Sequence, residues 1–213
     1  MSGDESTPAG DDPFVEALRK GARILARRDP VFRPLVKTYG VPTFRPHTDY
    51  FDTLVDSVIS QQISGRAAES ILRKLRAALG GFFDPNVMTA APDELIRGAG
   101  VSPQKLGYLR SLAAHVVDRR LDLEHLPSLS DQEIIRELTA IKGIGVWTAQ
   151  MFLIFSLGRL DVFPTGDLGV RRGMKNSYLL EELPLPRQMD EIAERNRWAP
   201  YRSIASWYMW RAS

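Results

Sequence analysis

The sequence predicts an all-α fold made of two helical lobes. Apolar residues recur at helical spacing along most of the chain, and no segment alternates between apolar and polar residues for long enough to predict a strand. At 213 residues, of which 44% are hydrophobic, the chain is long enough to bury a substantial core. A cleft between the two lobes is the expected place for a functional site.

The first half of the chain contains three apolar patterns that are typical of helices. Pro13 suits a first helical turn. The residues that follow it at helical spacing are Phe14, Val15, Leu18, Ile24 and Leu25. Two further stripes are Leu54, Val55, Val58 and Ile59, and Ile71, Leu72, Leu75 and Leu79, the second ended by Gly80 and Gly81. The proline-rich stretch between Asp29 and Pro46 is predicted as an extended connection with at most one helical turn.

The second half of the chain contains four more helical patterns. Ser102 and Pro103 begin a helix whose predicted inward residues are Leu106, Leu109, Leu112, Ala113, Val116 and Val117. Ser130 is expected to cap a short helix with Ile134, Ile135 and Leu138 on its apolar face. The nearly all-apolar run from Trp147 to Leu157 predicts a buried central helix, and Tyr201 to Trp210 has an aromatic helical pattern.

Composition excludes several classes of site. The chain has no cysteine, which rules out disulfides, zinc–thiolate sites and cysteine-ligated iron–sulfur clusters. The histidines (His47, His115 and His125) show no metal-ligand spacing. No stretch approaches the roughly 20 apolar residues of a membrane helix, so we expect no membrane association and a cytoplasmic location.

The first twelve residues differ from the rest in composition. Residues 1–12 are predicted as a disordered tail and 13–213 as one domain with two interleaved helical subdomains. The tail carries four acids, and without it 28 basic residues face 22 acidic ones, a net charge of +6. This charge permits nucleic-acid binding without requiring it.

The run from Leu138 to Ala149 is the most informative motif. Gly143 and Gly145 bracket Ile144 between the end of one predicted helix and the start of the next. Glycines allow a tight turn and the close approach of a phosphate, and the N–H groups at the start of the following helix favour an anion. An ordinary helix–turn–helix with glycine caps is the alternative interpretation of the glycine pair alone.

A loop rich in glycine and proline follows and ends at Asp167. Asp167 precedes another predicted helix, where its carboxylate would cap the N-terminus. The same position favours an ionised carboxylate, which could oppose positive charge that develops on a reacting sugar ring. Both interpretations remain open at this point.

Hairpin, glycine/proline loop and aspartate in this order resemble the helix-hairpin-helix–Gly/Pro–Asp superfamily of base-excision DNA glycosylases. The resemblance covers roughly Phe44 to Trp210 and is strongest to the 3-methyladenine DNA glycosylase II (AlkA-type) branch. Three segments carry it. They are Ile59-Ser-Gln-Gln-Ile-Ser64, Gly143-Ile-Gly-Val-Trp-Thr-Ala149 and Trp198-Ala-Pro-Tyr-Arg-Ser-Ile-Ala205.

The resemblance implies a catalytic role for Asp167, which would stabilise an oxocarbenium-like transition state. Trp147 occupies the position where bifunctional members of the superfamily carry a catalytic lysine, so it implies a monofunctional enzyme that leaves an abasic site. Trp147 and Trp210 match aromatic positions that stack on the flipped base, although Trp210 could equally be a core residue. Met151 stands where the branch has a tyrosine.

The resemblance also implies the contacts with DNA. Gln62 and Ile63 lie in the loop that inserts a wedge into the duplex, with Gln62 at the wedge position, although Gln62 could equally belong to the polar face of a helix. Four hairpin residues match family positions that contact a DNA phosphate. They are Lys142, Gly143, Gly145 and Thr148. The backbone carbonyls of Thr139, Ile141 and Ile144 match those that hold Na⁺ or K⁺. Arg202 is expected to brace the loop near Asp167.

These features together predict a compact glycosylase that lacks the N-terminal β-rich lobe of longer relatives. Its expected partner is double-stranded DNA with damaged, alkylated bases, bound by a monomer without a cofactor. Two alternatives are a non-enzymatic helix-hairpin-helix DNA-binding protein and a glycosylase for oxidised or mismatched bases. Asp167 argues against the first, and Trp147 in place of lysine argues against the second.

Overall fold

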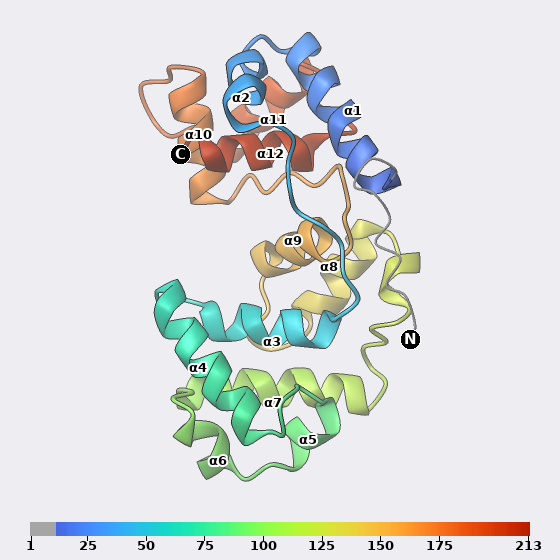
Figure 1. The fold of residues 1–213 in the computed structure, drawn as a ribbon, viewed down its shortest axis with the longest axis vertical. Coiled ribbons are helices and arrows are strands. Elements are labelled where there is room, and N and C mark those ends of the chain that lie inside the picture. The colour runs from blue at the N-terminus through green and yellow to red at the C-terminus, as the bar shows by residue number, and fades with distance from the viewer. Residues whose placement is uncertain (1–11) are drawn as a thin grey trace, which may run out of the picture. The chain divides into compact units, whose positions relative to one another are not determined.

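The computed structural model describes residues 12–213, and every regular element in this range is helical (Figure 1). The all-α prediction is therefore confirmed. The α-helices are α1 (Pro13–Arg28), α2 (Phe32–Tyr39), α3 (Tyr50–Ser60), α4 (Gly65–Ala78), α5 (Pro85–Ala90), α6 (Asp93–Gly98), α7 (Pro103–Val117), α8 (Asp131–Thr139), α9 (Val146–Phe155), α10 (Leu168–Ser177), α11 (Pro186–Arg195) and α12 (Arg202–Arg211). A short 3₁₀ helix, η1 (Leu126–Ser128), precedes α8.

The helices form two compact units, as predicted. The first unit contains α1 and α2 and then, after the chain returns at Gly158, α10 to α12; the second unit is residues 47–157 (Figure 1). The first unit is thus built from the two ends of the chain. The expected cleft concerns the placement of the two units relative to each other and stays a prediction.

The first unit has an aromatic core. The ring of Phe32 lies 5.2 Å from that of Trp198 and 5.9 Å from that of Tyr208, both in edge-on geometry. Asp29 is buried beside them, where its Oδ2 accepts hydrogen bonds from the indole N–H of Trp198 at 2.9 Å and from the hydroxyl of Tyr178. A buried carboxylate needs such partners, because an unpaired one is costly.

The stretch between Asp29 and Pro46 was wrongly predicted as mainly extended, because it contains the two-turn helix α2. Pro34 lies in the first turn of α2, where its missing N–H has no helical partner to lose. Phe32 at the start of α2 is completely buried. Burial of the Phe32 side chain in the tertiary structure therefore outweighs the local preference of the prolines for an extended backbone.

The second unit forms around the predicted apolar stripe of α3, whose Leu54, Val55, Val58 and Ile59 are all completely buried. Gly80 and Gly81 end the helical region after α4 with φ angles of +93° and +101°, which glycine adopts without strain. Ser102 and Ser130 cap α7 and α8 as predicted, and Ser130 forms a capping box with Glu133.

Three details of the helix predictions need correction. Val117 was expected to face inward and is exposed at the end of α7. The helix from Trp147 was expected to be buried throughout, yet Trp147 is 49% exposed. Asp12 was assigned to the disordered tail and instead caps α1, accepting a hydrogen bond from Phe14 N–H. The rest of the predicted tail lies outside the described residues.

Candidate functional site

Asp167 is the N-cap of α10 and lies at the end of the loop rich in glycine and proline. Its Oδ1 accepts a hydrogen bond from Val170 N–H at 2.8 Å. The residue as a whole is 9% exposed. Backbone N–H donors and the positive end of the helix dipole both favour the ionised carboxylate. The two interpretations of Asp167 are therefore compatible, since the cap itself prepares a charged, nearly buried acid.

Trp210 of α12 contacts the same carboxylate. Its indole N–H donates to Asp167 Oδ1 at 2.8 Å. Two glycines of α10 make this contact possible. A Cβ at Gly169 would lie 2.8 Å from Trp210 Cδ1, and a Cβ at Gly173 would lie 1.9 Å from the backbone oxygen of Met209. Because both positions lack a side chain, α12 packs directly on α10 and brings Trp210 to Asp167.

The loop before Asp167 is braced by the start of α12. Arg202 binds Asp161 with two hydrogen bonds of 2.8 Å, from Nε to Oδ1 and from Nη2 to Oδ2. Ser203 Oγ donates to Arg159 O at 2.6 Å and accepts from Val162 N–H at 2.9 Å. The hydrogen bonds to Asp161 raise the pKa of the Arg202 guanidinium. The expected structural role of Arg202 is confirmed.

The predicted hairpin joins α8 to α9. Ile144, between the two glycines of the turn, is buried. Gly143 has a φ of +93°, and a Cβ there would lie 2.2 Å from the ring of Tyr108. Gly145 is exposed, and a Cβ there would meet nothing within 4 Å. The two glycines thus differ, because Gly143 is required by the fold and Gly145 leaves open space at the start of α9.

The start of α9 presents backbone donors. The first helical hydrogen bond runs from Ala149 N–H to Gly145 O at 3.1 Å, so the N–H groups before it have no acceptor within the helix. Lys142 is exposed on the turn. Thr148 is only 4% exposed, so its hydroxyl is not on the surface. The predicted contact of Thr148 with DNA stays a prediction, and this burial gives it no support.

The predicted monovalent cation site consists of neutral backbone carbonyls. Ile141 O accepts one hydrogen bond, from Ile144 N–H at 3.1 Å, which leaves a carbonyl lone pair for another partner. Oxygen ligands without charge suit Na⁺ or K⁺ better than a transition metal. The roles of Thr139, Ile141 and Ile144 in holding a cation stay a prediction. In residues 12–213, no three histidine, aspartate or glutamate side chains form a group able to hold a metal ion.

The loop between α3 and α4 contains Gln62 in a left-handed conformation, with a φ of +57°. Such a φ is uncommon for a residue with a side chain and indicates a backbone held by its neighbours. Gln61 Nε2 donates to Gly143 O at 2.8 Å, and Lys105 Nζ donates to the carbonyls of Ile59 and Gln61 at 2.6 and 2.8 Å. Burial lowers the pKa of Lys105. We call Gln61 and Lys105 the loop clamp, since they tie this loop to the hairpin and to α7.

Trp147 and Met151 line a pocket of about 620 Å³ within the second unit. They lie one turn apart on α9, and Gln62 also lines this pocket. The remaining lining residues are His47, Thr53, Asp56, Ser57, Ser60 and Gln61. A half-exposed indole beside a pocket can stack on a flat ring. The exposure of Trp147 that contradicts the buried-helix prediction is thus what brings this residue to the wall of the pocket.

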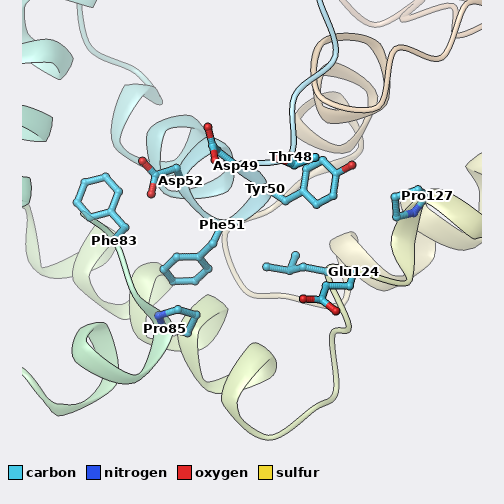
Figure 2. Close-up of a pocket in the computed structure, with 10 residues that line it drawn as sticks. Thr48, Asp49, Tyr50, Phe51, Asp52, Phe83, Pro85, Glu124 and Pro127 are labelled. Carbon is cyan, nitrogen blue, oxygen red and sulfur yellow. The ribbon is translucent and has the colours of Figure 1, made fainter. Parts of the chain in front are cut away.

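A second pocket of the same unit, of about 580 Å³, contains none of the predicted site residues. It lies at the N-terminal end of α3, and Figure 2 shows Asp49 and Asp52 with the ring of Phe51 pointing toward Pro85. Glu124 lies on another wall. Three acids make this pocket unsuited to a phosphate.

The structure therefore brings the predicted residues together in two groups. Asp167 and Trp210 share a hydrogen bond in the first unit, and Trp147, Met151 and Gln62 share a pocket in the second. Ile63 is exposed at the start of the segment after Gln62. Sequence reasoning missed the loop clamp and the polar residues of α3 in the pocket. The helical spacing of the polar residues of α3 could have identified that face from the sequence. No local sequence pattern indicated a role for Lys105.

Comparisons with known proteins identify the family and the relatives of this chain. Residues 55–199 match the model of the HhH-GPD superfamily of base excision DNA repair proteins. DNA-3-methyladenine glycosylase 1 of Schizosaccharomyces pombe is 34% identical over 95% of this chain and 90% of its own length. Within residues 12–213, no helix is long and apolar enough to cross a membrane.

Two solved structures share the fold over nearly their full length. The crystal structure of DNA-3-methyladenine glycosidase from Bacillus halodurans has a TM-score of 0.80 and 36% identity, covering 95% of this chain and 89% of that one. The Schizosaccharomyces pombe 3-methyladenine DNA glycosylase in complex with abasic DNA has a TM-score of 0.78 and 33% identity, covering 90% and 95%.

Proposed function

This chain belongs to the HhH-GPD superfamily of base excision DNA repair proteins, and from that membership we propose that it is a DNA-3-methyladenine glycosylase. It flips an alkylated base out of double-stranded DNA and hydrolyses the N-glycosidic bond. The products are the free base and an abasic site. The names of its relatives support 3-methyladenine as a substrate.

The observation that carries the proposal is the environment of Asp167. Its Oδ1 accepts hydrogen bonds from Val170 N–H and Trp210 Nε1, both at 2.8 Å, at the N-terminus of α10. As the bond between the sugar C1′ and the base breaks, positive charge develops on the deoxyribose ring. A fixed, ionised carboxylate stabilises that charge, and it can then orient the water that adds to C1′.

Trp147 supports a monofunctional reaction. A lyase step needs an amine that forms a Schiff base with the sugar, and an indole cannot supply one. The half-exposed indole of Trp147 in the pocket lining instead suits stacking on the flipped base. An electron-rich ring attracts a cationic one, such as a purine alkylated at N3 or N7.

The hairpin supplies the proposed grip on the DNA backbone. Gly145 leaves room for a phosphate beside the N–H groups of α9, and Lys142 adds a positive charge. A Na⁺ or K⁺ ion on the carbonyls of Thr139, Ile141 and Ile144 would strengthen this grip. Gln62, with Ile63 next to it, would fill the gap that the flipped base leaves. We propose that the protein acts as a monomer, in the cytoplasm.

The alternative of a non-enzymatic DNA-binding protein explains the hairpin equally well. It does not explain why Asp167 is held by a backbone donor and an indole donor together with Gly169, whose missing Cβ allows the contact. Phosphate binding has no use for that carboxylate. The other alternative is a glycosylase for oxidised or mismatched bases. Such bases are not cationic, so this alternative does not use the attraction of the Trp147 indole for a cationic ring.

The test is a panel of duplex oligonucleotides that each carry one lesion, together with DNA methylated by dimethyl sulfate. The protein should release 3-methyladenine from methylated DNA, detected by chromatography, and strand breaks should appear only after alkali. Release of oxidised or mismatched bases without release of alkylated ones would contradict the proposal. Tight binding with no released base would favour the non-enzymatic alternative.

A further inference from the structure

One face of α3 is polar and lines the pocket that contains Trp147. Its residues follow helical spacing and are Thr53, Asp56, Ser57 and Ser60. The opposite face of α3 is the completely buried apolar stripe. The fold therefore needs only one face of this helix, and the polar face is available to a ligand in the pocket.

Asp56 is the acidic residue of this pocket. Its Oδ1 is buried and accepts no hydrogen bond. The nearest cation is Arg76, whose Nη2 lies 3.7 Å from that oxygen, beyond hydrogen-bonding distance, and which forms a closer ion pair with Asp52. The side chain of Asp56 is 44% exposed. Since Oδ1 itself is buried, the exposed oxygen of the carboxylate is Oδ2, and Oδ2 is the atom able to bind a ligand in the pocket.

The charge of Asp56 is unusual for a protein that binds DNA. Of the residues that line the pocket, Asp56 is the one acid, and His47 is the other titratable group. Burial raises the pKa of Asp56, while Arg76 opposes that effect. A carboxylate on a DNA-binding surface repels phosphates. Because Arg76 lies closer to Asp52, the carboxylate of Asp56 in the pocket of Trp147 is suited to a positively charged ligand.

We infer that Asp56 is a specificity-determining residue that binds the flipped base itself. Its carboxylate accepts a hydrogen bond from the exocyclic amino group of an N-alkylated purine, and its negative charge favours the positive charge of that ring. Trp147 stacks on the face of the same base. Hydrogen bonding at the edge and stacking on the face together distinguish a cationic purine from a neutral one. This inference rests on the proposed function.

A purely structural role for Asp56 is the competing explanation. Asp56 and Asp52 both pair with Arg76, and on this explanation Asp56 only helps to join α3 to α4. Asp52 offers a matched control, because it lies one turn away in the same ion-pair group but lines the other pocket (Figure 2). Asp52→Asn removes the same charge from the same arginine without altering the pocket of Trp147.

The experiment compares Asp56→Asn, Asp52→Asn and the wild-type protein. Three quantities are measured for each: the single-turnover rate of 3-methyladenine release from methylated DNA, the affinity for a duplex with an abasic-site analogue, and the thermal midpoint. Asparagine keeps an acceptor oxygen but loses the negative charge, so the release rate of Asp56→Asn should fall by about tenfold to a hundredfold. Its affinity for the abasic duplex should stay near wild type, because that duplex lacks the base.

Two results would overturn the inference. One is a release rate for Asp56→Asn within about twofold of wild type, given the loss expected of a charged hydrogen bond. The other is an equal fall in rate for Asp52→Asn, which would assign the effect to the ion pairs with Arg76. If the wild-type protein releases no alkylated base, the proposed function fails first, so the two failures are distinguishable.

Discussion

Trp210 donates its indole N–H to the carboxylate of Asp167 across 2.8 Å. This contact gives Trp210 a role that stacking on a base does not require. A ring can stack without any donor, whereas the position of a catalytic carboxylate depends on its hydrogen bonds. We therefore expect Trp210 to position the carboxylate of Asp167 through this hydrogen bond, independently of any stacking on the flipped base.

Replacing Trp210 by phenylalanine separates these roles, because phenylalanine keeps an aromatic ring and loses the N–H. We expect the maximal rate of base release to fall by about tenfold to a hundredfold, as for a lost hydrogen bond to a charged group. Gly169→Ala should have a similar effect, since its Cβ would lie 2.8 Å from Trp210 Cδ1. A Trp210→Phe variant with a wild-type rate would show that only stacking matters.

Monofunctionality is tested by chemical trapping. Because Trp147 supplies no amine, borohydride should reduce no covalent adduct between the wild-type protein and lesion-containing DNA. The assay is denaturing electrophoresis of the protein after incubation with labelled duplex, with a known glycosylase/lyase as positive control. A trapped adduct would reveal another amine as nucleophile, and Lys142 would be the first residue to substitute.

The hairpin is tested by placing a carboxylate where the phosphate is proposed to lie. Gly145→Asp fits the fold, because a Cβ there meets nothing within 4 Å. Repulsion should weaken binding to damaged and undamaged duplex alike, on the order of tenfold or more. Gly98→Asp is the control, because Gly98 is also exposed with open space and lies on α6.

Lys142 is tested by the dependence of binding on salt. Lys142→Gln should reduce the slope of log affinity against log salt by about one unit, as for one released counterion. An unchanged slope would remove Lys142 from the proposed interface. Normal DNA binding by a stably folded Gly145→Asp variant would show that the hairpin does not bind the DNA backbone.

The loop clamp predicts an effect on base flipping. Lys105→Met leaves the carbonyls of Ile59 and Gln61 without their donor, so Gln62 should lose its fixed conformation. The fluorescence of 2-aminopurine placed beside the lesion rises when the base flips. We expect this rise to be several-fold slower for Lys105→Met, because each lost hydrogen bond contributes about 1 kcal/mol. The exposed Lys74 gives the control, Lys74→Met. Equal flipping by both variants would contradict the role of the clamp.

The parts of the site that depend on local sequence could be predicted. The turn from α8 to α9 follows from two glycines around a buried isoleucine, and the cap at Asp167 follows from a loop that ends at a helix. Both are short-range patterns, in which the residues that determine the geometry are near neighbours. The apolar stripe of α3 is likewise a local pattern, and its predicted residues are all buried.

The parts that depend on distant contacts could not be predicted. Trp210 lies 43 residues after Asp167, and only the packing of α12 on α10 brings them together. Lys105 reaches the carbonyl of Ile59, 46 residues earlier in the chain. The buried Phe32 makes α2 helical in a proline-rich stretch for the same reason. In each case the deciding interaction is tertiary, and the local pattern does not reveal it.

The most direct test of the central claim is the single-turnover rate of 3-methyladenine release by Asp167→Asn. Asparagine caps helices as well as aspartate does, so the variant should fold and should bind an abasic duplex with near wild-type affinity. Without the charge, the rate should fall by about a hundredfold or more. A rate close to wild type in a folded, DNA-binding variant would contradict the assignment of Asp167 as the catalytic residue.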